Sequence, residues 1–194
     1  MTHEIYLDID GVLNRWQLDH MSMRCGRKIT EEDWSTELGW DIVGVCEELT
    51  GEPITSAEFW ASVSEYSWSS ANKSELFTML IHESAKIVGC ENVHVVSTVP
   101  PDRSPESYSG KARWCRDFLP EWLQENVRLV TGKKHKLAKP GRLLIDDATH
   151  NVVEWEDAGG EAILVPRPWN SHYGLDPKQF VKKSLVLWGK KVCG

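Results

Sequence analysis

The sequence predicts an α/β fold, in which a parallel sheet is covered by helices on both faces. Short apolar runs alternate along the 194 residues with segments whose apolar side chains recur at the helical period. Strands separated by helices pair in parallel, and such strands are apolar throughout because both faces are buried. Reactive side chains follow several of these runs, at the sheet edge where ligands of such folds bind.

Five strands are expected where an apolar run meets a turn or a polar stretch. The first ends in two acids, and Pro100-Pro101 ends the second. The expected strands cover residues 5–8, 93–97, 127–131, 143–147 and 162–165.

Helices are expected between these strands. Apolar residues at the 3.6-residue period predict a helix over residues 74–88, which Gly89 ends. Thr149 is the expected N-cap of another helix, and Gly159-Gly160 form its exit. The other expected helices cover residues 111–119, 134–138, 150–158 and 177–187.

One long segment interrupts the alternation. Residues 15–72 are acidic, rich in tryptophan and without regular periodicity, so an irregular insert is expected after the first strand. The predicted organisation is a core of residues 1–14 and 73–194, with residues 15–72 inserted over the site as a cap.

Charge is unevenly distributed along the chain. Residues 29–72 contain ten acids and no Lys or Arg, whereas residues 128–142 contain six Lys or Arg and no acid. The basic stretch is a natural place for an anion such as phosphate, although both stretches are also what solvated faces look like. The net charge of −7 argues against binding to extended nucleic acid or to an anionic membrane.

Composition also indicates where the protein works. The five cysteines lack CxxC spacing, which favours a reduced, cytoplasmic protein without a zinc site. The N-terminus is polar, and no apolar run approaches the roughly 18 residues that a membrane span needs, so neither a signal peptide nor a span is expected.

The first strand ends in the most informative motif. Asp8 and Asp10 are spaced i, i+2, so both carboxylates lie on one face of the strand. Two carboxylates held together repel each other unless a cation, a shared proton or a substrate compensates them. A Mg²⁺ ion with a phosphoryl group would do so, which predicts metal-assisted phosphoryl chemistry.

Four motifs in order resemble those of the haloacid dehalogenase (HAD) superfamily. They span residues 4–165 and comprise Asp8-Ile-Asp10-Gly-Val-Leu, Val95-Val-Ser97-Thr98, Lys134 or Lys136, and Leu144-Ile-Asp146-Asp147. Within the superfamily, the stretch from Asn151 and Trp155 through Gly159-Gly160 to Trp169-Asn resembles the 5'(3')-deoxyribonucleotidase-like group. The resemblance implies a HAD-like Rossmannoid sheet with a small, mainly helical cap inserted after the first strand.

The resemblance also implies roles for the acids. Asp8 would be the nucleophile that forms an aspartyl-phosphate, and Asp10 the general acid and then the general base. Mg²⁺ would be held by the Asp8 carboxylate, the Asp10 backbone carbonyl and Asp146, with Asp147 acting through a water molecule.

Phosphate binding is expected from the second and third motifs. Ser97 would hold a phosphate oxygen through its hydroxyl, and Thr98 would add a backbone or hydroxyl contact. A lysine would neutralise the phosphate charge. Lys134 is preferred because its spacing in sequence after the preceding strand fits, and Lys136 is the alternative because its spacing before Asp146 fits. Lys111 would either reach the phosphate or be a solvated helix residue.

Substrate selection is expected from the insert. Trp16, Phe59 and Trp60 are the candidates to stack on a substrate ring, and Trp34, Trp40 and Trp68 are further possibilities. The expected function is Mg²⁺-dependent hydrolysis of a small phosphate ester, above all a nucleoside monophosphate. Two alternatives stay open, a polynucleotide 3'-phosphatase and a non-catalytic HAD-like binding protein. His150 and Arg167 are interpreted as structural.

Overall fold

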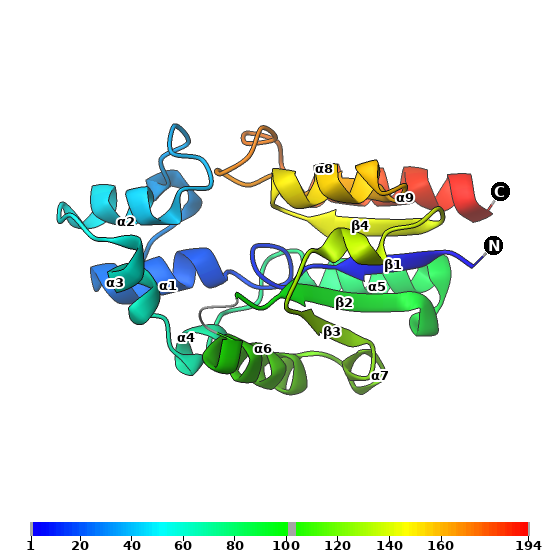
Figure 1. The fold of residues 1–194 in the computed structure, drawn as a ribbon. Coiled ribbons are helices and arrows are strands. Elements are labelled where there is room, and N and C mark those ends of the chain that lie inside the picture. The colour runs from blue at the N-terminus through cyan, green and yellow to red at the C-terminus, as the bar shows by residue number, and fades with distance from the viewer. Residues whose placement is uncertain (1, 101–103, 194) are drawn as a thin grey trace.

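A computed structural model describes residues 2–100 and 104–193 and confirms the predicted fold class. Five strands form one sheet in the order β3-β2-β1-β4-β5, and every neighbouring pair is parallel (Figure 1). The strands are β1 (Glu4–Leu7), β2 (Val93–Thr98), β3 (Val127–Val130), β4 (Arg142–Asp146) and β5 (Glu161–Leu164).

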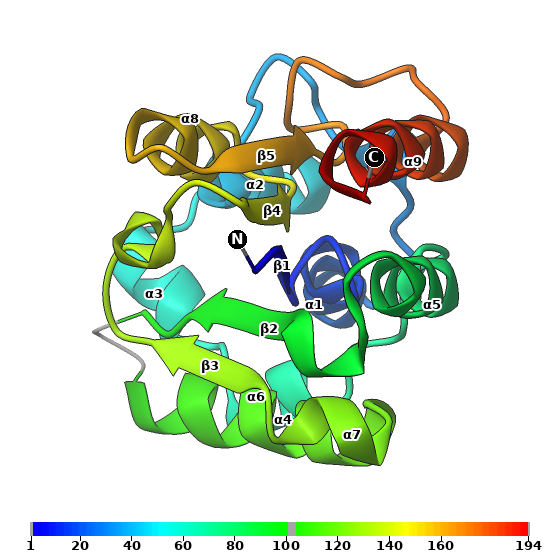
Figure 2. The ribbon, with the colours of Figure 1, turned by 90° about the vertical axis from the view of Figure 1, so that its right-hand side faces the viewer.

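Helices cover both faces of the sheet. In the end-on view, α5 and α9 lie on one face and α8 on the other, while α6 and α7 lie beside β3 (Figure 2). The core helices are α5 (Phe77–Val88), α6 (Ser104–Phe118), α7 (Glu121–Gln124), α8 (Thr149–Asp157) and α9 (Pro177–Cys193). Short 3-10 helices precede β2 (η2, Cys90–Asn92) and β4 (η4, Lys134–Leu137).

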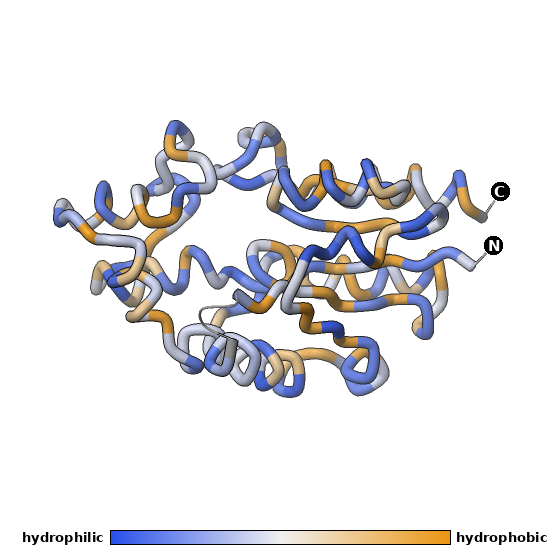
Figure 3. The backbone as a smooth tube through the Cα atoms, viewed as in Figure 1, coloured by the Kyte–Doolittle hydropathy of each residue, from blue (hydrophilic) through white to orange (hydrophobic). Residues whose placement is uncertain are grey.

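The hydrophobic core lies between the sheet and these helices. Hydrophobic residues are frequent along the strands, whereas hydrophobic and polar residues alternate along the helices (Figure 3). Trp114 and Trp155 are the largest fully buried side chains among the described residues. Two of the ten tryptophans therefore serve to pack the core.

Strand order determines which side chains meet. The central strand β1 pairs with β2 on one side and β4 on the other, and Leu7 lies opposite both Val95 and Ile145. The residues that follow β1, the end of β2 and the end of β4 therefore lie at one sheet edge.

Residues 15–72, hereafter the insert, are mainly helical, as the resemblance implies, and not irregular as the lack of periodicity indicated. They form α1 (Trp16–Cys25), η1 (Glu31–Asp33), α2 (Ile42–Thr50), α3 (Ser56–Ala61) and α4 (Glu65–Ser69). Side chains cap the N-termini of α3 and α4, where Thr55 with Glu58 and Ser64 with Ser67 form reciprocal capping boxes. The helices are too short to show a clear period in sequence, and they lie beyond the carboxyl ends of the strands (Figure 1).

Two core helices extend beyond their predicted limits. Helix α6 begins at Ser104 rather than at residue 111, and α9 continues to Cys193. Serines and Gly110 weaken the helical pattern at the start of α6, but packing against α4 stabilises this part of the helix. Thr149 is the first residue of α8 and not its N-cap, which is Ala148. Among the described residues, no helix is long and apolar enough to cross a membrane.

Candidate active site

A cavity of about 440 Å³ lies between the carboxyl edge of the sheet and the insert. This volume is within the range of small-molecule sites. Charged residues line it from the core, and aromatic residues line it from the insert. The lining includes Asp8, Asp10, Trp16, Gln17, Trp40, Trp60, Trp68, Ser97, Thr98, Lys111, Thr131, Lys133, Lys134, His150 and Asn151.

Three acids form a buried cluster at the cavity's core side. Carboxylate oxygens of Asp8, Asp146 and Asp147 lie within 4.8 Å of one another, and we call this the three-acid cluster. Asp8 is 5% exposed, and the other two are fully buried. Lys134, itself buried, bridges the cluster with its Nζ 2.8 Å from Asp8 Oδ1 and 2.7 Å from Asp146 Oδ2.

The buried carboxylates of the cluster repel one another, and the single charge of Lys134 does not compensate this repulsion. Burial raises the pKa of Asp8 to about 7; Lys134 opposes this rise, and Asp146 and Asp10 add to it. Burial, with the charges of Asp146 and Asp8, also raises the pKa of Asp147 well above its usual range. Burial alone would lower the pKa of Lys134, but the carboxylates of Asp146 and Asp8 outweigh it and raise that pKa.

Asp147 has one carboxylate oxygen that is held and one that is not. Its Oδ2 accepts hydrogen bonds from Trp169 Nε1 at 2.9 Å and Gln17 Nε2 at 3.4 Å. Its Oδ1 is buried without a hydrogen-bond partner among the residues that the structure describes. Buried polar atoms are rarely left unpaired, so the unpaired Oδ1 indicates that a ligand binds here.

The residues present fit a divalent cation. The donors are carboxylate oxygens, which Mg²⁺ prefers, and the cluster combines excess negative charge with an unpaired oxygen. The cluster contains Asp8 and Asp146, as expected from the sequence, and it contains Asp147 as a third member. The side chain of Asp10 points elsewhere, to Lys111.

A second lysine organises the opposite side of the cavity. Lys111 is 3% exposed, and its Nζ lies 2.6 Å from Asp10 Oδ2. The same nitrogen donates to Ser97 Oγ at 2.9 Å and to the Thr98 carbonyl at 2.6 Å. Asn14 Nδ2 donates to Asp10 Oδ1 at 3.3 Å. Asp10, Ser97 and Thr98 therefore converge on one buried amine.

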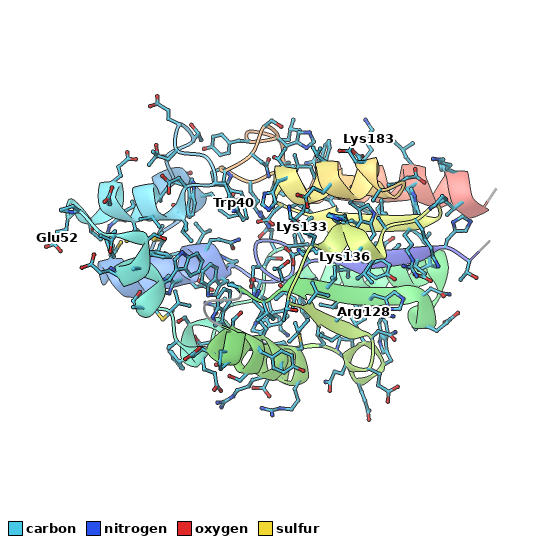
Figure 4. All side chains as sticks on the ribbon, in the orientation of Figure 1. Trp40, Glu52, Arg128, Lys133, Lys136 and Lys183 are labelled. Atoms are coloured by element: carbon cyan, nitrogen blue, oxygen red, sulfur yellow. The ribbon has the colours of Figure 1, made fainter. Side chains whose placement is uncertain are left out.

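The two lysines compared in the sequence have different environments. Lys134 lies in the three-acid cluster, whereas Lys136 is exposed. In Figure 4, Lys136 lies farther from the insert than Lys133 does. Lys111, which the sequence left between two interpretations, lies in the site. Its position was hard to predict because the residues before it obscure the helix that carries it.

The insert supplies an aromatic wall formed by Trp16, Trp40, Trp60 and Trp68, hereafter the tryptophan wall. The Trp16 ring is nearly parallel to Trp68 at a centroid distance of 3.9 Å and to Trp60 at 6.2 Å. Lys111 Nζ lies 4.5 Å from the Trp68 ring centroid, so the wall meets the charged side of the cavity there.

The expectation for Phe59 needs correction, because its side chain lies away from the cavity. Phe59 is fully buried and packs edge-on against Trp60 and His20. Adjacent helix residues point about 100° apart, so Trp60 lines the cavity while Phe59 packs inside the insert.

A smaller hollow of about 80 Å³ adjoins the cavity. Trp34, Trp40 and Trp169 line it, and Trp40 also lies edge-on to His150 at 6.0 Å. Trp40 and Lys133 lie at the boundary between the insert and the core (Figure 4). Gln17 also lines the hollow, and its buried Oε1 lacks a hydrogen-bond partner among the described residues; nothing in the sequence pattern marked it.

The fold has counterparts among solved structures. No family model matches the chain, and no curated protein sequence matches it. A haloacid dehalogenase-like family hydrolase from Xanthomonas campestris matches with a TM-score of 0.53 and 9% identity, over 98% of this chain and 94% of that chain. A HAD-superfamily hydrolase, subfamily IA, variant 1, from Geobacter sulfurreducens matches with a TM-score of 0.50 and 14% identity, over 95% and 96%. At these identities the likeness establishes the fold: the chain folds as these HAD hydrolases do.

Proposed function

We propose that this chain, which shares the fold of HAD-superfamily hydrolases, is a Mg²⁺-dependent phosphomonoesterase acting on a small phosphate ester, above all a nucleoside monophosphate. One observation carries the proposal. Two acids just after β1, a hydroxyl at the end of β2 and two buried lysines line one cavity, and two further acids at the end of β4 cluster with the first of the β1 acids. Such a set binds a phosphoryl group and supplies both a nucleophile and a proton donor.

Asp8 is the proposed nucleophile. It follows the central strand, and the Ile9 N–H donates to its Oδ1 at 2.8 Å, so its carboxylate has a fixed orientation. Attack of a carboxylate oxygen on phosphorus forms an aspartyl-phosphate and breaks the bond between phosphorus and the ester oxygen. Ser97, Lys111 and Lys134 would hold the phosphate oxygens and stabilise the negative charge that develops on them.

Asp10 is the proposed proton donor. A leaving alkoxide needs a proton, and Asp10 would give it one and then take a proton from the water that attacks the aspartyl-phosphate. This step regenerates Asp8 and releases inorganic phosphate. Lys111 and Asn14 hold the two Asp10 oxygens, which directs the carboxyl group into the cavity.

The three-acid cluster is the proposed metal site. Asp8 and Asp146 would hold Mg²⁺ directly together with the Asp10 backbone carbonyl, and Asp147 would act directly or through water. When bound, the ion would neutralise the acids and the phosphate charge. Trp169 and Gln17 orient Asp147 from outside the cluster.

The insert is the proposed cap and the source of selectivity. The tryptophan wall faces the charged side of the cavity, and its rings suit a leaving alcohol that carries a planar ring, such as the base of a nucleoside. Sugar and ring would then lie toward Trp16 and Trp60, with the phosphate at Lys111 and Lys134.

Phosphate release from a panel of nucleoside monophosphates and sugar phosphates tests the proposal. The panel is run with Mg²⁺ or EDTA, using wild type, Asp8→Asn and, as a matched control, Asp157→Asn on the exposed end of α8. We expect Mg²⁺-dependent release from nucleotides that only Asp8→Asn abolishes. Release from sugar phosphates alone would refute the nucleotide assignment. Release only from a 3'-phosphorylated oligonucleotide would favour the polynucleotide alternative, and no release from any ester would refute the hydrolase.

A further inference from the structure

Arg167 is a buried cation that the proposed mechanism does not use. It lies in the loop after β5, yet its side chain is 3% exposed. Its Nε donates to the Gly11 carbonyl at 2.7 Å, and its Nη1 lies 2.9 Å from Glu31 Oε1 and 2.7 Å from Glu75 Oε1. One guanidinium therefore joins three segments that are distant in the sequence.

Each of these segments has a distinct place in the fold. Gly11 directly follows Asp10, the proposed proton donor. Glu31 begins η1 in the insert, and Glu75 lies where the chain has returned to the core before α5. The planar fork of arginine can satisfy several fixed acceptors at once, which the single amine of lysine cannot do in the same geometry.

The Gly11 turn is held from two sides. Gly11 has a φ of 76°, and a Cβ on it would lie 1.8 Å from Asp147 Oδ2. The turn thus lies against Asp147 of the three-acid cluster, and Arg167 holds the Gly11 carbonyl. A residue here other than glycine would displace Asp147, so the turn leaves the backbone little freedom.

We propose that Arg167 is a positioning residue, which fixes the Gly11 turn, and through it Asp10, relative to the insert. The proposal rests on the proposed hydrolase function for its kinetic consequence, because Asp10 must reach the leaving oxygen. A misplacement of a catalytic group by about 1 Å can cost roughly 100-fold in rate. Loss of Arg167 should therefore lower kcat more than it changes KM.

The test compares Arg167→Met and Arg167→Lys with Arg142→Met. Arg142 is also a partly buried, ion-paired arginine, but its partner Glu4 lies at the opposite end of β1 and β4. For each folded variant, kcat and KM are measured with the best substrate. Hydrogen exchange of residues 10–14 is followed by mass spectrometry, because the Leu13 and Asn14 amides donate to the Ile9 carbonyl and report on the turn.

We expect Arg167→Met to lower kcat by roughly 10- to 100-fold and to speed exchange in the turn, with Arg167→Lys intermediate and Arg142→Met unchanged in both. Wild-type kcat and wild-type exchange in Arg167→Met would overturn the proposal. If Arg167→Met does not fold, Arg167→Lys decides by the same two readouts. If wild type hydrolyses no ester, the hydrolase proposal fails, while exchange in the turn still decides whether Arg167 positions it.

Discussion

The tryptophan wall lines the cavity, and the three-acid cluster reaches the same cavity through Asp8, but the two regions are built in opposite ways. The cluster comes from the ends of β1 and β4, and buried charges with short contacts to Lys134 hold it. The wall comes from the insert, and stacked rings form it. The difference separates two tasks: the sheet edge can carry the chemistry of one reaction, while a wall of aromatic rings can determine what the cavity admits.

Lys134→Met tests the cluster with the largest expected effect. It leaves Asp8 and Asp146 without their shared cation, which should lower the free energy of unfolding by about 3–5 kcal/mol in EDTA. Phosphate release should fall by at least about 100-fold, because the developing charge loses a donor. Urea unfolding with and without Mg²⁺ and the release assay measure both effects.

Lys136→Met is the matched control, since Lys136 is exposed in the same 3-10 helix. It should change stability by no more than about 0.5 kcal/mol. Equal losses in the two variants would show that the basic stretch acts as a whole and that Lys134 has no special place.

A fall in pH should destabilise the insert and stabilise the three-acid cluster. Burial lowers the pKa of His20, which stacks on Trp16, from 6.5 to about 4, and the charge of Arg24 adds to this. The unfolded chain therefore binds the proton first, so the insert loses stability as pH falls from about 6.5 to 4, by at most about 3 kcal/mol. Asp8 has its pKa raised to about 7, so the folded state binds its proton first and the cluster gains stability as pH falls below 7.

Unfolding free energies between pH 4 and 7.5, measured in EDTA, separate the two effects. His20→Leu should remove the acid loss that His20 causes, and Asp8→Asn should reduce the acid gain, of which Asp147 supplies another part because burial raises its pKa too. His82→Leu, at an exposed position on α5, should keep the wild-type pH profile. The account of His20 fails if the unfolding free energies of His20→Leu and His82→Leu change equally with pH.

Gly110→Ala tests how the wall is attached to the core. A Cβ at Gly110 of α6 would lie 2.5 Å from Trp68 Cβ and 2.6 Å from the Glu65 carbonyl oxygen of α4. The helices would have to separate, at a cost of about 1–3 kcal/mol. Thermal unfolding measures the loss, and Gly132→Ala, where the nearest atom is the flexible end of Lys136 at 3.8 Å, serves as the control. Equal stability of the two variants would show that α4 and α6 tolerate separation.

Trp60→Ala tests the wall itself with the smallest expected effect. Loss of one stacking face should raise KM for a nucleotide by about 10-fold and leave kcat unchanged. Glycerol phosphate, which has no ring, should be hydrolysed as by wild type. Phe59→Leu is the control, because its side chain is buried away from the cavity. A fall in kcat with both substrates would instead assign Trp60 to the chemistry.

The cluster was predictable from the sequence, and the wall was only partly so. Asp8 follows one apolar run and Asp146 ends another, and parallel pairing of β1 with β4 brings these strand ends together. Nothing comparable fixes a short insert helix, so sequence could not separate Trp60 from Phe59. The sequence could not show what Arg167 contacts, because its partners lie in segments far apart in the chain.

The most direct test of the central claim is to identify the residue that becomes phosphorylated. Asp10→Asn should slow hydrolysis of the intermediate, because the attacking water loses its base. Asp10 is also the proposed proton donor of the first step, so the variant is mixed with Mg²⁺ and an aryl phosphate, whose phenolate leaves without a proton, then quenched in acid and mapped by peptide mass spectrometry. The account predicts one phosphoryl group on Asp8. Phosphate release with Asp8 unmodified, or a phosphoryl group on another residue, would contradict it.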